Sequence, residues 1–150
     1  MARVDIDGAE DVARNLRKMA DRYGKAVADA IYESGQMVRT SAIKSIQTTS
    51  PGQIVTRTRE GGGTYQHTAS VPDSAPNTDT GRLVSSIQVE VERGAVFVGS
   101  TLKYSGYLEL GTRGMAARPW LTPALEGNRR KIIQRIVDAT NRTSRRHGEV

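Results

Sequence analysis

The sequence predicts an α+β domain, in which a long N-terminal helix (or two helices) and a C-terminal helix pack on a small antiparallel β-sheet, with a long flexible arm between them. Three features predict this fold. Apolar residues recur every three or four positions near both ends of the chain, they alternate with polar residues at 87–91, and the stretch at 48–80 is rich in Ser, Thr, Pro and Gly. The chain has 150 residues, which is most simply one domain with one modest core.

Residues 1–47 are expected to form a short strand and then one or two helices. Val4 and Ile6 alternate with charged residues, and Asp7 can cap the helix that follows. Helical spacing covers about residues 8–47, where Gly24 marks a possible break. The first apolar stripe is Val12, Leu16 and Met19, and the second is Val27, Ile31, Ser34, Val38, Ala42 and Ile46. Gly35 keeps the second stripe slim, so we expect a sheet or another helix to come close there.

Residues 48–80 form the predicted arm, an extended segment or flexible hairpin that reaches away from the core. The segments "QIVTRT" and "TYQHTAS" flank "REGGG", an arrangement typical of a flexible hairpin. The apolar side chains of the arm are too few to fold it alone. A loop of this length inside a compact domain is usually functional or disordered.

Residues 81–121 are expected to contain a β-hairpin and a motif-bearing loop, and residues 122–144 a C-terminal helix. Ile87, Val89 and Val91 alternate with polar residues, "RG" at 93–94 makes the turn, and the fully apolar "AVFVG" predicts a central strand. The next apolar run, at 104–110, is interpreted as strand-like. Thr122 before Pro123 is typical of a helix N-terminus. The buried stripe of that helix is predicted to be Leu125, Ile132, Ile133, Ile136 and Val137.

The composition narrows the classes of function. The net charge of +6 and the pI near 10.0 fit contact with a polyanion such as DNA, an acidic protein partner, or a solvated surface. The chain has no cysteine, which excludes disulfides, thiolate zinc sites and cysteine nucleophiles. Its apolar runs are far shorter than the roughly 20 residues of a membrane helix, and its N-terminus lacks the features of a secretory or transit peptide. We therefore expect no membrane association, and a protein made and used in the cytoplasm or assembled there into something larger.

Catalytic, metal-binding and cofactor-binding residues are not predicted. His67 and His147 are the only histidines, and they fall in the arm and in the polar tail, where neither is expected to be held rigidly. No pair of His, Asp or Glu has a metal-ligand spacing on a predicted rigid element, and neither "REGGG" nor "LGTRG" has the pattern of a phosphate-binding loop. Glu109 is interpreted either as a general base or, preferably, as the charged partner of Arg113 or Arg118 that holds the turn.

Two stretches, "TDTGRLVSSIQVEV" at 78–91 and "GSTLKYSGYLELGTRGMAARPWLTPALEGN" at 99–128, carry a series of motifs. They read Asp-Thr-Gly, then Leu and Ser-Ile, then Tyr-x-x-Tyr-x-Glu-x-Gly-Thr, then Ala-Arg-Pro-aromatic-Leu-x-Pro-Ala. The series resembles the tail-component or neck proteins of long-tailed phages, also called head–tail connector or tail-completion proteins. The matching residues are Asp79, Thr80, Gly81, Leu83, Ser86, Ile87, Tyr104, Tyr107, Glu109, Gly111, Thr112, Ala117, Arg118, Pro119, Trp120, Leu121, Pro123 and Ala124. The arm is longer than we expect for the family, and Leu110 stands where many members have Phe or Tyr.

The resemblance implies a non-enzymatic structural virion protein, assembled in the host cytoplasm, that forms a ring in the virion neck. It implies a closed ring of six or twelve copies, contact with adjacent neck proteins on the portal or adaptor side and on the tail-terminator side, and genomic double-stranded DNA passing transiently through the lumen. The residues expected at a subunit or ring interface are Tyr104, Tyr107, Glu109, Gly111, Thr112, Arg113, Arg118, Pro119 and Trp120. Trp120 is interpreted equally as an interface anchor or as a core residue packed on the helices. The possible DNA-facing residues are Arg57, Arg59, Arg129, Arg130 and Arg135.

Two other functions remain open from the sequence. A small basic DNA-binding or packaging accessory protein would explain the charge, and it predicts salt-sensitive DNA affinity of the free subunit. An inhibitor or antitoxin-like module would bind one host protein and form no ring.

Overall fold

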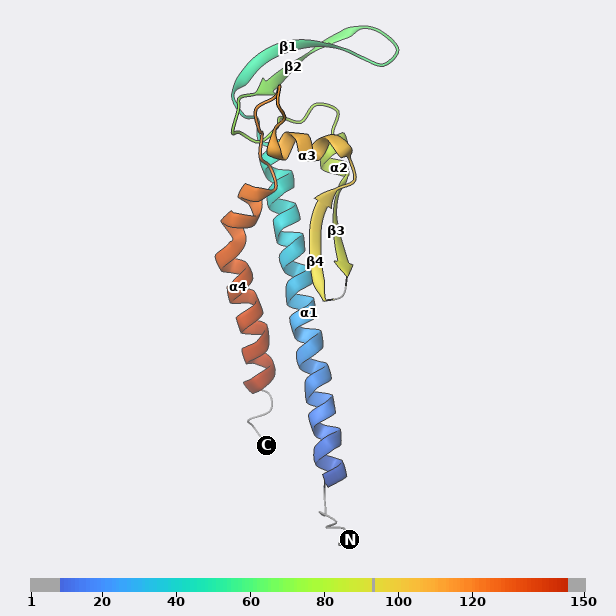
Figure 1. Cartoon of the computed structure of the whole chain (residues 1–150), viewed down its shortest axis with the longest axis vertical. Helices are drawn as coiled ribbons and strands as arrows, with labels where there is room; N and C mark the ends of the chain where they lie inside the picture. Colours follow the sequence, from blue (N-terminus) through green and yellow to red (C-terminus); the bar gives the residue numbers. More distant parts are fainter. Residues whose placement is uncertain (1–8, 93, 146–150) are drawn as a thin grey trace.

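The computed structural model describes residues 9–92 and 94–145, and it has an elongated α+β fold (Figure 1). The elements in chain order are α1 (Ala9–Gln47), β1 (Gly52–Thr58), β2 (Thr64–Ser70), α2 (Arg82–Ser85), β3 (Ile87–Glu92), β4 (Ala95–Ser100), α3 (Lys103–Leu110) and α4 (Thr122–Arg145). The predicted fold class, with long helices at both ends and small antiparallel sheets between them, is confirmed. The predicted strand at Val4 and Ile6, the cap Asp7 and the tail residue His147 lie outside the described residues.

α1 is a single helix of 39 residues, which resolves the choice between one helix and two. Gly24 lies inside α1 and does not end it. A glycine in a helix interior costs only about 1 kcal/mol relative to alanine, which a helix packed along its upper half tolerates. The second predicted stripe is the packed face, because Ser34, Val38, Ala42 and Ile46 are all buried.

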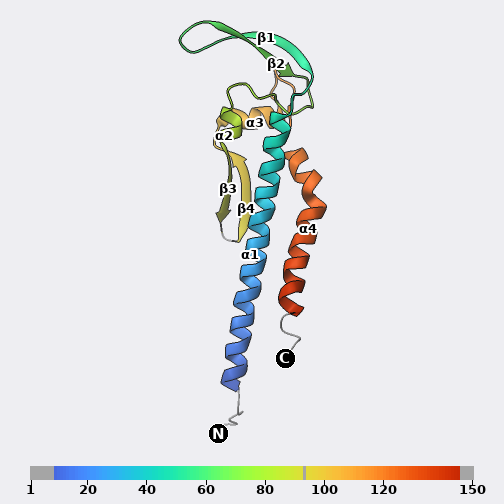
Figure 2. The same cartoon turned by 180° about the vertical axis from the view of Figure 1, so that it is seen from behind.

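α1 lies between two partners, with α4 along one side and the β3–β4 hairpin along the other (Figures 1 and 2). At Gly35 an added Cβ would overlap Val96 of β4, so the predicted close approach at this glycine is confirmed. The Arg39 Nε donates a 2.8 Å hydrogen bond to the carbonyl of Ile87 on the same side. On the other side, the Asn128 Nδ2 donates to the Ser41 Oγ at 2.9 Å, which fixes α4 against α1.

The β3–β4 sheet has two strands, so the prediction that "AVFVG" is a central strand is wrong: no further strand pairs with β4 among the described residues. Val89 pairs with Val98, and Glu90 pairs with Phe97. Directly paired residues lie on the same face of an antiparallel sheet. Val89 and Val96 on one face pack on α1, whereas the opposite face leaves Phe97 57% exposed. The apolar run therefore reflects one buried face and one unpartnered face.

The core sits where the upper end of α1 meets α2, β3 and the start of α4. Its buried members are Val38, Ala42, Ile46, Leu83, Ile87, Trp120 and Ala124. The predicted buried stripe of α4 is wrong in part, because Leu125, Ile133 and Val137 are 47%, 56% and 44% exposed. The small residues Ala124, Asn128 and Ala139 face the interior instead. They let α4 approach α1 closely, which turns the larger apolar side chains of α4 toward solvent.

The arm contains the predicted hairpin, in which β1 pairs with β2 from Gly52↔Ser70 to Thr58↔Thr64. The three glycines at 61–63 all have positive φ angles, which supply the turn. The hairpin curves away from the end of the stem, which is the part of the molecule formed by α1 and α4 (Figure 2). Its flexibility stays a prediction.

The strand-like interpretation of 104–110 is wrong, since these residues belong to the helix α3. Tyr104, Tyr107 and Leu108 are spaced three and four positions apart, which is the spacing of a helix face. α3 lies across the upper end of α1, between the stem and the hairpin β1–β2 (Figure 1).

Candidate functional site

The motif residues converge at the end of the stem, where the β1–β2 hairpin, the segment 76–84, α3 and the loop at 111–121 meet. They surround a cavity of about 600 Å³ whose lining includes Arg57, Tyr65, His67, Asp79, Tyr104 and Arg118. Two of the motif groups that were read separately from the sequence, Asp-Thr-Gly and Tyr-x-x-Tyr, therefore contribute to a single site.

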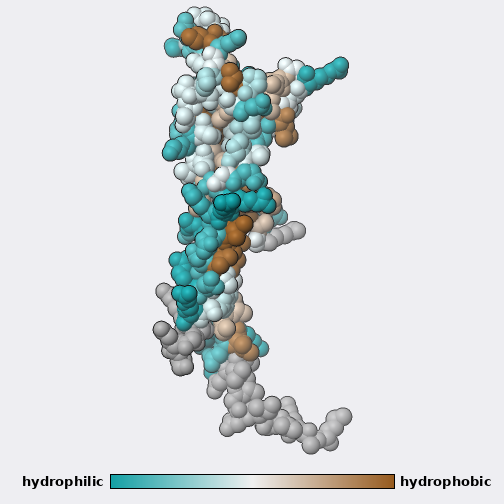
Figure 3. All heavy atoms as spheres, turned by 90° about the vertical axis from the view of Figure 1, so that its left-hand side faces the viewer, coloured by the Kyte–Doolittle hydropathy of each residue, from teal (hydrophilic) through white to brown (hydrophobic). Residues whose placement is uncertain are grey.

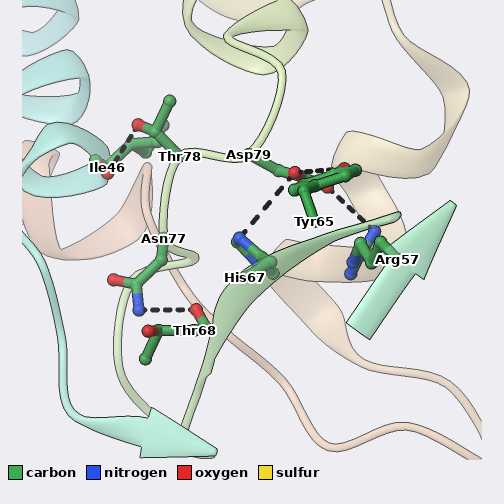
Figure 4. Close-up of polar contacts among 8 residues, drawn as sticks. All are labelled: Ile46, Arg57, Tyr65, His67, Thr68, Asn77, Thr78 and Asp79. Atoms are coloured by element: carbon green, nitrogen blue, oxygen red, sulfur yellow. Dashed lines mark hydrogen bonds and ion pairs between the residues drawn. The ribbon is translucent and has the colours of Figure 1, made fainter. Parts of the chain in front are cut away.

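Asp79 of the Asp-Thr-Gly motif connects the hairpin to the body of the protein (Figure 4). Its Oδ1 accepts a 2.6 Å hydrogen bond from the Tyr65 hydroxyl, and its Oδ2 lies 2.9 Å from the Arg57 Nη1. The His67 Nδ1 is 3.8 Å from the same carboxylate. The hydrogen bond to Asp79, together with desolvation and the negative charge, raises the pKa of Tyr65 above its ordinary value of 10.0. Residues of both β1 and β2 thus contact the Asp79 carboxylate.

Asn77 and Thr78 fasten the hairpin base, and the sequence did not single out either residue. The Asn77 Nδ2 donates to the carbonyls of Ser50 and Thr68 at 2.8 and 2.9 Å, while its Oδ1 accepts from the Ser50 N–H at 2.6 Å. The Thr78 Oγ1 donates to the Ile46 carbonyl at 3.0 Å. The sequence gives little indication of the role of Asn77. Its three hydrogen bonds reach backbone groups that are far from it along the chain, and only the fold brings them together. The hairpin base is therefore fixed to the end of α1.

Glu109 caps α4. Its carboxylate accepts backbone hydrogen bonds from Trp120 and Leu121 through Oε2, at 2.8 and 2.9 Å, and from Thr122 through Oε1, at 2.8 Å. Desolvation opposes ionisation, but the hydrogen bonds from residues 120–122 outweigh it and hold the pKa of Glu109 below its ordinary value of 4.5. The prediction that Glu109 pairs with Arg113 or Arg118 is wrong, because the backbone N–H groups just before and at the start of α4 supply its partners.

Arg118 fixes the motif loop to the hairpin. Its Nε donates to the Ser70 carbonyl of β2 at 2.9 Å, and its backbone N–H donates to the Leu108 carbonyl of α3 at 2.6 Å. Gly111 has a φ of 74°, and an added Cβ would lie 2.9 Å from the backbone nitrogen of Ala117. Only glycine fits this left-handed position against the returning chain. Arg118 and Gly111 thus fix the conformation of the loop at 111–121.

Trp120 is a core residue. It is 2% exposed, and its Nε1 donates to the Ser105 carbonyl at 3.4 Å. Several other predicted interface residues are accessible: Tyr104 is 42% exposed, Tyr107 is 59% exposed, and Thr112 and Arg113 are exposed in the turn. Leu110, which was not included in the predicted interface, is 81% exposed.

The five arginines predicted to face DNA do not form one surface. Arg57 and Arg59 lie at the hairpin, whereas Arg129, Arg130 and Arg135 lie on α4 (Figure 1). Arg57 pairs with Asp79, Arg129 with Glu126, and Arg135 with Glu33. The Arg59 guanidinium lies 5.6 Å from the ring centroid of Tyr65. Most of this predicted set is engaged within the chain.

Within residues 9–92 and 94–145, no group of three or more His, Asp or Glu residues could hold a metal ion. The described helices include none that is long and apolar enough to cross a membrane. The polar side chains of the site bind other segments of the same chain and so hold the hairpin, α3 and the loop at 111–121 together.

Comparison with known families gives the class of the protein. A family model described as "Bacteriophage HK97-gp10, putative tail-component" matches residues 10–111, from α1 through the end of α3. The chain belongs to this HK97-gp10-like family. No curated protein and no solved structure matches the chain. The protein is thus a structural tail component of a bacteriophage, located in the virion among other virion proteins.

Proposed function

We propose that the protein forms a ring in the neck of the virion, joins the head to the tail and lets genomic DNA pass through its lumen. The observation that carries this proposal is the exposed apolar side of α3. Tyr104, Tyr107 and Leu110 are spaced three positions apart, so they lie along one side of the helix, and all three are exposed. Aromatic side chains gathered on a surface are typical of a protein interface.

The groups beneath α3 hold this surface rigid. Ser105 is the buried residue of α3, the buried Trp120 donates to its carbonyl, and Glu109 joins α3 to the start of α4. Arg118 joins the loop after α3 to β2. A surface that is already ordered loses little conformational entropy on binding. α3 is therefore suited to dock on an adjacent neck protein, on the portal or adaptor side or on the tail-terminator side.

The ring is proposed to be closed, with six or twelve copies assembled in the host cytoplasm, and to surround double-stranded DNA transiently. Head-to-tail contacts between identical subunits generate closed rings when the rotation between subunits closes. A subunit that leaves Leu16, Phe97 and Ile133 more than half exposed retains apolar surface for such contacts.

The charge of α4 favours a second candidate, a small basic DNA-binding or packaging accessory protein. α4 carries six Lys or Arg residues and two acidic residues. This candidate predicts that the free chain binds duplex DNA with an affinity that falls steeply as salt rises. Titration of labelled DNA with the purified chain at low and at physiological salt measures it, and a chain that binds no DNA at low salt counts against it.

Deletion of the gene from the phage, followed by imaging of the particles, tests the neck proposal. We expect separate heads and tails, and joined virions when the wild-type gene is restored. Restoration with Tyr107→Ser should join far fewer particles, whereas Tyr32→Ser, which changes an exposed tyrosine on α1, should restore joining. Normal joined virions without the gene would refute the neck function, and full activity of Tyr107→Ser would remove α3 from the interface.

A further inference from the structure

We propose that neighbouring copies of this chain contact each other laterally, with the outer side of α4 in one copy against the outer side of the β3–β4 hairpin in the next. The first surface, called the α4 face, consists of Leu125, Arg129, Arg130, Ile133 and Val137. The second surface, called the hairpin face, consists of Gln88, Glu90 and Phe97. The inference rests on the ring proposed above and names the two surfaces that close it.

The α4 face combines three apolar side chains with two arginines, and all five are exposed. Leu125, Ile133 and Val137 are each more than two fifths exposed, because Ala124 and Asn128 make the contact with α1. The view toward this side of the molecule has an apolar patch among hydrophilic side chains along the stem (Figure 3). Such a patch on a helix that is already packed elsewhere indicates a protein contact.

The hairpin face is also exposed to solvent, since Gln88, Glu90 and Phe97 are all exposed, and the charge of Glu90 is opposite to that of the α4 face. Phe97 is 57% exposed, and Glu90 pairs with it across the two strands. Beside them is a hollow of about 250 Å³ whose lining includes Gln88, Glu90 and Phe97. The aromatic ring of Phe97, the hollow and the Glu90 carboxylate complement the branched apolar side chains and arginines of the α4 face.

α4 and the β3–β4 hairpin lie on opposite sides of α1, and the hairpin is level with the upper part of α4 (Figures 1 and 2). One chain therefore cannot join its own two faces, whereas two chains side by side can. Such a contact is head-to-tail: a copy that uses its α4 face on one neighbour still has its hairpin face for the next, so the contact repeats until the ring closes. The charges select this pairing, because two basic α4 faces would repel each other.

A cysteine cross-linking experiment on assembled virions tests the pairing directly. The chain has no cysteine, so Phe97→Cys and Ile133→Cys introduce the only two thiols of the subunit. Both positions are more than half exposed, so the substitutions leave the core intact. With a short bis-maleimide reagent, we expect the double variant to give a ladder of dimers, trimers and larger species on a denaturing gel. Each single variant should stay monomeric.

Two results would overturn the proposal. Absence of a ladder from assembled virions carrying this double variant and a second one, Gln88→Cys with Val137→Cys, would show that the faces do not meet. Dimers from Ile133→Cys alone would show that α4 packs on α4. A double variant that fails to assemble is replaced by the second pair, whose positions are also exposed.

A charge exchange provides an independent readout. Arg130→Glu should lower the yield of joined virions at least several-fold, and adding Glu90→Arg should restore most of it, whereas Lys25→Glu on the exposed lower part of α1 should have little effect. An equal loss in the double charge variant would count against the pairing. If joining requires the gene but neither readout responds, the neck function stands and only these surfaces are wrong. If joining does not require the gene, the proposed function itself fails.

Discussion

Substitution of Glu109 tests whether a single carboxylate connects α3 to α4. Its oxygens accept three backbone N–H groups from residues 120–122, at 2.8 to 2.9 Å. Glu109→Gln keeps a neutral acceptor but removes the charge that favours the N-terminal end of the helix dipole, which should cost about 1 kcal/mol. Glu109→Ala removes the acceptor altogether and leaves the N–H groups to water, which should cost about 2–3 kcal/mol.

Thermal unfolding followed by circular dichroism measures both effects. A loss of 1 kcal/mol in a domain of this size lowers Tm by about 2–4 °C, so Glu109→Gln should lower Tm by about 3 °C and Glu109→Ala by about 6 °C or more. The matched control is Glu126→Gln on α4, because Glu126 is exposed and pairs only with the exposed Arg129 among the described residues. It should change the free energy of unfolding by less than about 0.5 kcal/mol.

The pH dependence of the unfolding temperature tests the contribution of the Glu109 charge to stability. The pKa of Glu109 is lower in the folded chain than its ordinary value of 4.5, so its stabilising effect is fully present above pH 4.5 and is lost as the pH falls through the folded-state pKa. The difference in Tm between wild type and Glu109→Gln should therefore shrink below pH 4.5. Equal Tm values for Glu109→Gln and the Glu126→Gln control at neutral pH would refute the capping role. A difference that grows on acidification would refute the charge argument.

Two further predictions concern the packing of α1 and the hairpin base. Gly35→Ala should lower the free energy of unfolding by about 1–3 kcal/mol in chemical denaturation, because the new Cβ would overlap β4. Gly24→Ala, with nothing within 4 Å of the new Cβ, should raise it by about 0.5–1 kcal/mol. Changes of the same sign in both variants would contradict the close approach of β4 at Gly35. Asp79→Asn should bring the pKa of Tyr65 back toward 10.0, since the hydrogen bond to Asp79 is the main cause that raises it. NMR titration of the Tyr65 ring measures this pKa, and an unchanged value would place the cause elsewhere.

Features of the fold that depend on local pattern could be predicted from the sequence. The stripe ending at Ile46 indicated the packed face of α1, and the glycine at 35 indicated where β4 comes close. The alternation at 87–91 indicated β3, because Ile87 is buried and Val89 is half-buried, whereas Gln88 and Glu90 between and beside them are exposed. Each of these signals comes from the side chains of the element that it predicts.

Other features depend on which segments meet in space, and local pattern does not contain that information. Glu109 is eleven or more residues from the N–H groups that it caps, so an arginine nearby in the sequence was the more obvious partner. Leu125 and Ile133 fit a buried stripe by spacing, but the contact with α1 uses smaller neighbours. Alternation around Leu108 favoured a strand, although the spacing of the two tyrosines already fitted the helix α3.

The central claim is that this chain forms a closed ring in the neck. A cryo-electron microscopy reconstruction of the neck of intact virions, computed without imposed symmetry, tests it most directly. The claim predicts a closed ring of six or twelve copies between the portal or adaptor and the tail, fitted by the helical pair α1–α4, with the Tyr104 and Tyr107 side of α3 against a neighbouring protein. Density for the chain that is confined to the tail tube, or a neck in which no ring matches the α1–α4 pair, would contradict it.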